Sequence, residues 1–310
     1  MLAFTDEPIK KIAAMTFDAY QREPGINQSL LRLFDRNSGG APAKYRHACL
    51  HPEDRPEPSR AMEFGSAYHC LSLTPEEFER RYVVRTAEVE EECFTMAQLG
   101  KSKAKAFSTK LKTYENWVAL QEEQGLTVIT AKQERQLQAM RAALLDSSEV
   151  RDSGVLEPGC AFEVSLFAPY TLPSGSDRFQ LKGRLDAMPV GDAIIDLKSA
   201  RAASPRPFAR TVADMRLDLQ AAFYLDLANA NGLPKKRFGF LAQDKEPPYL
   251  PSLLWMPEDW ITYGRSTACG YRRILNDISE SIRTKRWPGY GSEMLEWPSW
   301  LNAEIEAVAA

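Results

Sequence analysis

The chain has 310 residues, 44% hydrophobic and 26% charged, a composition typical of a globular protein rather than a disordered or fibrous one. Its formal net charge of −3 excludes a globally basic nucleic-acid binder, so any contact with nucleic acid must come from locally gathered lysines and arginines. No apolar run approaches the roughly 20 residues that span a bilayer, and the N-terminus lacks a signal-peptide core. We therefore expect a cytoplasmic protein with no membrane segment and with reduced cysteines.

The first half of the chain, residues 1–150, is expected to be helical. Spacing of apolar residues at three and four positions indicates the helices here. The predicted helical segments are residues 27–35, residues 59–73 and a charged, weakly patterned insertion at residues 86–128.

Two capping-box signatures mark further helix starts in this half. Thr74 is followed three residues later by Glu77, and Thr130 is followed by Gln133. In such a pair each side chain bonds the backbone of the other residue, which favours a helix that begins after the threonine. The second of these helices is expected to continue to about residue 146, because apolar residues recur along it at helical spacing.

The second half changes to short alternating segments separated by turn residues, which predicts strands. We expect a single α/β domain with a mixed central sheet flanked by helices, in which residues 151–290 carry the catalytic sheet. The predicted elements are strands at 162–167, 180–188, 193–197, 237–243 and 251–256, helices at 207–229 and 257–284, and a short tail at 291–310.

The most informative segment is the strand that carries Asp196 and Lys198. Because side chains alternate along a strand, these two polar residues share one face, while Ile195 and Leu197 point to the other. On an exposed strand such an Asp-x-Lys pair is usually a solvated ion pair, and that alternative stays open on this segment alone.

A second acid, Asp186, precedes this strand by a short turn. If residues 190–192 form a three-residue hairpin loop, Asp186 lies directly opposite Asp196, with Cβ atoms roughly 5 Å apart. Facing carboxylates destabilise a hairpin unless a cation compensates them. Because carboxylate oxygens are natural Mg²⁺ ligands, the pair predicts a metal site, in which Lys198 can hold a water or a phosphate.

These residues resemble a known pattern, that of the PD-(D/E)xK nuclease superfamily, with Leu-Asp at Asp186 where the family has Pro-Asp. More specifically, residues 25–290 resemble the catalytic domain of RecE-type exonucleases (exonuclease VIII) and their phage-encoded relatives. The order and spacing of the motifs, rather than any single one, carry this resemblance. The motifs are Ile26-Asn-Gln-Ser-Leu-Leu31, Pro42-Ala-Lys-Tyr45, Phe64-Gly65-Ser66-Ala-Tyr-His69, Leu73-Thr-Pro75-Glu-Glu-Phe78, the acid pair and Gln220-Ala-Ala-Phe-Tyr224.

The resemblance implies a metal site and its ligands. His69 matches the histidine that RecB- and RecE-like nucleases contribute from an early helix, although a histidine packed in the core near Cys70 is the ordinary alternative. Asp186, Asp196 and Lys198 are the implied catalytic residues. The implied ligands of Mg²⁺, for which Mn²⁺ is expected to substitute, are His69, Asp186, Asp196, the Leu197 carbonyl and, from the preceding strand, Glu163.

The resemblance also implies residues that face DNA. Gln220 and Tyr224 are four apart, so they share one face of the helix that follows the acid pair. Arg184 shares the strand face of Asp186, and could pair with a carboxylate or contact a phosphate. Arg201 belongs to a basic segment after Lys198. A solvated glutamine, a partly buried tyrosine and solvated charges are the alternatives.

The implied activity is 5′-to-3′ exonuclease cleavage of linear double-stranded DNA, which leaves 3′ overhangs for a single-strand annealing protein in recombination. Processive relatives form rings, so a homo-oligomer is compatible with the resemblance. Two rivals are weighed against it. An iron–sulfur nuclease would need three clustered C-terminal cysteines, and only Cys269 lies there. An idle nuclease fold that serves as a DNA-end binding or assembly subunit would have no reason to keep facing carboxylates.

Overall fold

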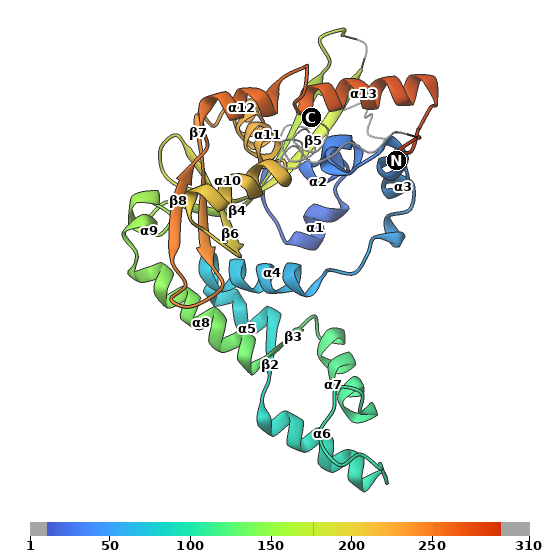
Figure 1. Ribbon diagram of the computed structural model, residues 1–310, viewed down its shortest axis with the longest axis vertical. Coiled ribbons are helices and arrows are strands. Elements are labelled where there is room, and N and C mark those ends of the chain that lie inside the picture. Colours follow the sequence, from blue (N-terminus) through green and yellow to red (C-terminus); the bar gives the residue numbers. More distant parts are fainter. Residues whose placement is uncertain (1–10, 176, 293–310) are drawn as a thin grey trace, which may run out of the picture.

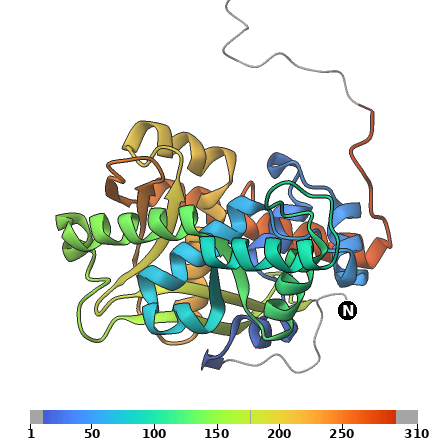
Figure 2. The ribbon, with the colours of Figure 1, turned by 90° about the horizontal axis from the view of Figure 1, so that it is seen from below.

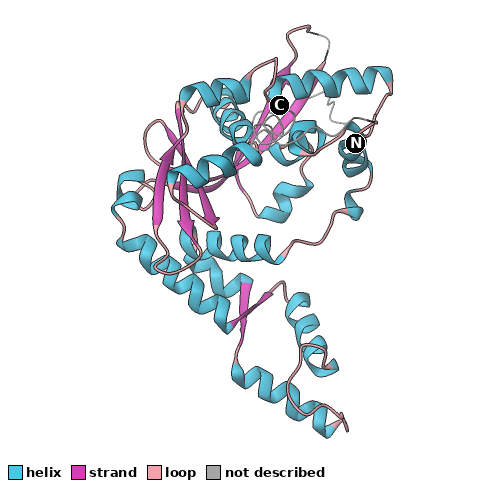
Figure 3. Ribbon diagram, in the orientation of Figure 1, coloured by secondary structure: helices cyan, strands magenta, loops and turns pink. Residues whose placement is uncertain are grey.

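The computed structural model describes residues 11–175 and 177–292, and its centre is a six-stranded mixed sheet (Figures 1 and 3). Neighbouring strands are antiparallel except for β6 and β7, which run parallel. A parallel pair needs a crossover connection, and helices supply it here. In sheet order the strands are β1 (Lys11–Ala14), β4 (Ala161–Thr171), β5 (Arg178–Met188), β6 (Ala193–Ala200), β7 (Arg237–Asp244) and β8 (Pro251–Trp255).

The expected α/β fold with a mixed, helix-flanked sheet is confirmed, with one correction at the N-terminus. The first half of the chain is not purely helical, because β1 pairs with β4 at an edge of the sheet, and short strands at residues 82–85 and 127–130 pair with each other. Four residues are too few for a clear alternating pattern. The predicted tail at 291–310 lies outside the described residues apart from its first two.

Among the described residues, six helices cover one face of the sheet. The main hydrophobic core lies between them and the sheet, and includes Phe223, Phe238 and Phe240, each at most 1% exposed. The helices of this face are α2 (Gln28–Phe34), α3 (Pro42–Leu50), α10 (Pro205–Asp214), α11 (Leu217–Ala230), α12 (Glu258–Arg265) and α13 (Tyr271–Thr284). A short helix, α1 (Phe17–Arg22), follows β1.

A second core lies on the opposite face, beneath α4 (Arg60–Leu73), α5 (Phe78–Arg81), α8 (Ala131–Asp146) and α9 (Ser148–Ser153). Tyr68 anchors α4 to the sheet, because its buried hydroxyl donates a 2.5 Å hydrogen bond to Gln243 of β7. Within the part of the chain described here, no helix is both long enough and apolar enough to cross a bilayer.

The register of β5 and β6 matches the one expected from the sequence. Ala187 pairs with Ile195, which is the register of a three-residue loop at 190–192 and makes Asp186 and Asp196 the next positions along the two strands. Ile195 and Leu197 are buried in the second core, while Ile194 belongs to the main core. Both faces of β6 are therefore covered, which explains why Asp196 is only 2% exposed.

Two long helices expected from the sequence are each broken in the structure. The helix predicted at 207–229 divides into α10 and α11 at Arg216, whose φ of 51° is incompatible with a continuous helix. Buried ion pairs from Arg216 to Asp35 and Asp218 hold this break. Such tertiary contacts leave no periodic signal in the sequence.

The helix predicted at 257–284 divides into α12 and α13, and Gly270 caps the second. A Cβ atom on Gly264 would lie 2.2 Å from the Asp218 carbonyl oxygen, so this glycine lets α12 pack closely on α11. The close approach fixes where α12 lies, and α13 then starts in a new direction.

The two predicted capping boxes have different outcomes. The reciprocal bonds between Thr130 and Gln133 at the start of α8 are present. The box at Thr74 is wrong, because residues Pro75–Glu77 form a 3-10 turn and the Thr74 hydroxyl donates backwards to the Cys70 carbonyl at 3.3 Å.

The predicted insertion at 86–128 is a helical arm. Strands β2 (Tyr82–Arg85) and β3 (Thr127–Thr130) pair in parallel at its base, and α6 (Ala87–Leu99) and α7 (Lys112–Glu123) extend from them. The arm projects from the body beside α4 and α5, and Figure 2 views the molecule from the side of this arm. A small aromatic and aliphatic core of its own, separate from the two cores of the sheet, holds the arm together.

Candidate active site

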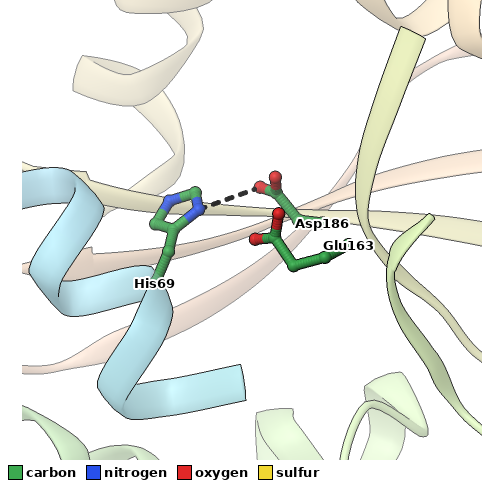
Figure 4. A group of neighbouring side chains, drawn as sticks. All are labelled: His69, Glu163 and Asp186. Carbon is green, nitrogen blue, oxygen red and sulfur yellow. Dashed lines mark ion pairs between the residues drawn. The ribbon is translucent and has the colours of Figure 1, made fainter. Parts of the chain in front are cut away.

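Three potential metal ligands from three different elements meet at one end of the sheet. His69 of α4, Glu163 of β4 and Asp186 of β5 each offer one ligand atom, and these atoms all lie within 4.8 Å of one another. Figure 4 shows the two carboxylates side by side and facing the imidazole. His69 Nδ1 lies 3.5 Å from Asp186 Oδ2.

Strand register explains why the two acids are neighbours. Phe162 pairs with Ala187 and Val164 pairs with Leu185, so Glu163 stands across from Asp186. Glu163 has a φ of 52°, a left-handed conformation that costs a non-glycine residue about 1–2 kcal/mol. Residues held in such conformations concentrate at functional sites.

Arg184 compensates the negative charge of Glu163. Its Nε donates to Glu163 Oε2 at 2.5 Å, and its Nη1 donates to the Ser165 hydroxyl at 3.0 Å and to the Met15 carbonyl at 2.7 Å. Of the two roles left open for Arg184, pairing with a carboxylate is therefore the one seen here. The sequence alone could have found this contact only through the register of β4 and β5.

Asp186 is held ionised by its surroundings. Burial alone would raise its pKa, but His69, Lys198 and the Leu197 N–H together hold the pKa below its usual range. The Leu197 N–H donates to Asp186 Oδ2 at 2.9 Å. The backbone of Leu197 thus reaches Asp186 through its amide, and the metal contact of its carbonyl that the resemblance implies stays a prediction.

Asp186 in turn changes the pKa of the His69 imidazole. Burial opposes its charged form, yet Asp186 raises the pKa of His69 above the usual value, and Asp196 adds to that rise. Asp186 Oδ1 and Glu163 Oε1 make no hydrogen bond to any residue that the structure describes. Each acid therefore keeps one oxygen that a ligand can use.

Asp196 lies beside this group and is held by two side chains. Gln220 of α11 donates from Nε2 to Asp196 Oδ1 at 2.5 Å, and Lys198 Nζ forms an ion pair with Oδ2. Burial raises the pKa of Asp196 to about 6, with a further contribution from Asp186, although Lys198 opposes the rise. Burial opposes the charged form of Lys198, but Asp196 and Asp186 raise its pKa above the usual value.

Gln220 and Tyr224 share the face of α11 that covers the acids, as their spacing predicts. The Gln220 amide is committed to Asp196 rather than open to solvent. Tyr224 packs over β5, since a Cβ atom on Gly183 would lie 3.0 Å from its ring. Burial raises the pKa of Tyr224 well above its usual value, and the nearby carboxylates add to that effect.

Other predicted basic residues lie apart from the acids. Arg201 is exposed just after β6 and makes no contact with the residues above in the described part of the chain. Lys235 is 7% exposed and donates to the carbonyls of Pro189 and Gly191, so it supports the β5–β6 loop. Arg237 pairs with Asp192 of the same loop.

The chemistry of the donor set fits a divalent cation. An imidazole nitrogen and two carboxylates converge, and the carboxylates would repel one another without a positive charge between them. Asp196 lies outside the group of three, and its Oδ2 already has the Lys198 ammonium as its counter-ion. The structure thus places Glu163 in the innermost group of candidate ligands with His69 and Asp186.

Comparison with known proteins supports the nuclease fold. A family model described as "PDDEXK-like domain of unknown function (DUF3799)" matches residues 28–297. The chain is similar to the crystal structure of a "putative exonuclease" from Eubacterium rectale, with a TM-score of 0.57 and 13% identity over 94% of this chain and 98% of that one. A second solved structure, SSO0001, aligns at a TM-score of 0.28 with 16% identity over 63% of this chain and 87% of that one, too low to carry an argument. No curated protein matched.

Proposed function

The chain belongs to the PDDEXK-like domain family, and from that premise we propose that it is a Mg²⁺-dependent exodeoxyribonuclease. The substrate we propose is the end of linear double-stranded DNA, which the enzyme would degrade from 5′ to 3′ and leave with a 3′ overhang. The observation that carries the proposal is the convergence of His69, Glu163 and Asp186 next to the Asp196–Lys198 pair.

The residues divide into two sets with different tasks. His69, Glu163 and Asp186 would hold the cation, for which Mn²⁺ should substitute, with Asp196 as a fourth ligand on that side. When bound, the cation would lower the pKa of a coordinated water and neutralise charge on the scissile phosphate.

The second set acts on water and phosphate directly. Lys198 carries an ammonium whose side chain is 28% exposed, so it can reach a phosphate oxygen while it remains paired with Asp196. Gln220 fixes the orientation of the Asp196 carboxylate, because its amide donates to Oδ1. Asp196 can then use Oδ2 to accept a proton from water or to join the metal shell, and Lys198 must shift for either.

Cleavage from an end, its polarity and the biological setting are supported by resemblance. The motif order is similar to that of RecE-type exonucleases, and the structural neighbour from Eubacterium rectale is itself described as a "putative exonuclease". We further propose a cytoplasmic enzyme that works with a single-strand annealing protein and assembles as a homo-oligomeric ring.

The test is cleavage of linear duplex DNA, labelled at the 5′ end in one sample and at the 3′ end in another, in the presence of Mg²⁺. We expect early release of the 5′ label, retention of the 3′ label and no cleavage of a closed circular duplex. Asp196→Ala should abolish the activity. Asp192→Ala is the matched control, because it removes a half-exposed carboxylate from the same hairpin and should retain activity.

Equal activity of Asp196→Ala and the wild type would overturn the assignment of the site, and so would no activity of the wild type with either Mg²⁺ or Mn²⁺. Cleavage of the circle would contradict the exonuclease assignment alone.

A further inference from the structure

The loop at the tip of the helical arm is strongly basic. Five lysines and no acidic residue lie between positions 100 and 113. All five are exposed, and only Lys112 has an ion-pair partner, Glu115, among the described residues. The lysines are Lys101, Lys103, Lys105, Lys110 and Lys112.

Charge is segregated along the arm. The glutamates of α6 lie in its first six residues, next to β2, and Glu122 and Glu123 end α7 next to β3. Glu92, the last of these glutamates in α6, lies seven residues before the end of the helix, so the basic loop begins about 10 Å beyond it, while Glu115 of α7 lies close to the loop and pairs with Lys112. The loop itself carries only positive charge, and such a surface attracts a polyanion.

The basic loop is also held in place. Leu111 is buried and Phe107 is half-buried in the small core of the arm, where the Phe107 ring lies edge-on to Tyr114. Gln98 of α6 donates from Nε2 to the Ala104 carbonyl at 2.7 Å. The lysines are therefore presented outward from an anchored backbone.

From this we propose that the arm is a second contact surface for duplex DNA, on which the lysines bind backbone phosphates away from the active site. The identity of the polyanion rests on the proposed function. The arm leaves the body directly after α4 and α5, and α4 carries His69 (Figure 1). Duplex DNA held at the active site can extend toward the arm, so the lysines would hold the substrate without reading its sequence.

The test is the binding of labelled duplex DNA without divalent metal, in EDTA, across a series of salt concentrations. The variant replaces Lys103, Lys105 and Lys110 with glutamine, and leaves Lys101 in place because its φ is 64°. The matched control replaces three exposed lysines elsewhere, Lys44, Lys132 and Lys236, with glutamine.

We expect the arm variant to bind a duplex of about 40 base pairs at least tenfold more weakly near 0.1 M salt. The slope of log K against log salt should fall by about 0.9 for each lost phosphate contact, hence by up to about 2.7. The control should keep both values. A duplex of about 10 base pairs, about 34 Å long, should show a smaller difference between the two variants.

Equal affinity and slope for the arm variant and the control would overturn the proposal. Exposed Met96 and Leu99 lie near this loop, so an anionic lipid surface is the alternative partner. Loss of binding to vesicles that contain phosphatidylserine, with DNA binding unchanged, would also overturn the proposal. Because the measurement needs no cleavage, a protein without nuclease activity can still pass it. An active nuclease can likewise fail it.

Discussion

Arg184 Nε lies 2.5 Å from Glu163 Oε2, and this pair links the edge strand β1 to the candidate metal site. The same guanidinium donates to the Met15 carbonyl just after β1 and to the Ser165 hydroxyl. Arg184 thereby holds Glu163 in its left-handed conformation and aims the carboxylate at Asp186. It is a positioning residue for a proposed ligand.

Arg184→Lys should therefore weaken metal binding more than catalysis. A lysine keeps the charge, but its single ammonium lacks the planar fork by which Nε and Nη1 of Arg184 donate from two separate positions. Loss of such a supporting contact typically costs 10–100-fold in metal affinity, so the Mg²⁺ concentration for half-maximal cleavage should rise by about that factor. The rate at saturating Mg²⁺ should change much less.

Arg178→Lys is the control for this change, because Arg178 is exposed on the same strand. If Arg184→Lys lowered the saturated rate and left the Mg²⁺ requirement unaltered, Arg184 would act on the substrate instead.

Asp196→Asn should inactivate the enzyme and stabilise the metal-free fold. Burial raises the pKa of Asp196 to about 6, so folding disfavours the ionised carboxylate relative to the protonated one. The native state binds more protons than the unfolded state between about pH 4 and pH 6, so stability falls as pH rises through that window. Asparagine does not titrate. The variant should gain on the order of 1–3 kcal/mol at pH 8 and progressively less below pH 6.

Urea unfolding in EDTA at pH 8 and pH 5 measures this gain. Asp192→Asn, whose carboxylate is paired at the surface, should remain within about 0.5 kcal/mol of the wild type. A gain for Asp196→Asn that was larger at pH 5 than at pH 8 would contradict the assigned pKa direction.

His69→Ala should remove the stabilisation that Mg²⁺ or Mn²⁺ gives to the protein. A ligand that binds only the folded state stabilises it by RT ln(1 + [L]/Kd), so a metal at about 100 times Kd adds about 2.7 kcal/mol. We expect the wild type to melt at a higher temperature with Mn²⁺ than in EDTA, and the variant to show little difference. His47→Ala, which removes an exposed imidazole from α3, should respond to Mn²⁺ as the wild type does.

An unchanged response of His69→Ala to Mn²⁺ would make His69 a packing residue. This measurement is independent of nuclease activity, so it tests the metal site even if the substrate is different.

Gln220→Glu should shift the pH dependence of cleavage toward alkaline pH. Gln220 Nε2 lies 2.5 Å from Asp196 Oδ1, and a second carboxylate there would disfavour the ionised form of Asp196. The acidic limb of the pH–rate profile should move up by at least one pH unit, since like charges at such a distance commonly produce shifts of about this size. Gln138→Glu adds the same charge at an exposed position of α8 and should leave the profile in place. A uniform loss of rate with no shift of the limb would indicate misfolding or a direct contact with DNA.

The sequence by itself determined the sheet that carries the site. Segments bounded by turn residues marked β4 to β8, and the loop at 190–192 predicted the register in which Ala187 pairs with Ile195, because a hairpin of given loop length has one register. It also indicated that Ile195 and Leu197 would be buried opposite Asp196 and Lys198. These are local properties of neighbouring residues, which a pattern of side chains along the chain can encode.

Contacts between distant segments decided the rest. The break at Arg216 depends on a buried ion pair with Asp35, 181 positions away, and the edge strand β1 depends on β4. The inner place of Glu163 beside His69 and the commitment of Gln220 to Asp196 likewise join separate elements. Such contacts gain their free energy only when tertiary packing excludes water from both partners, so no local periodicity announces them.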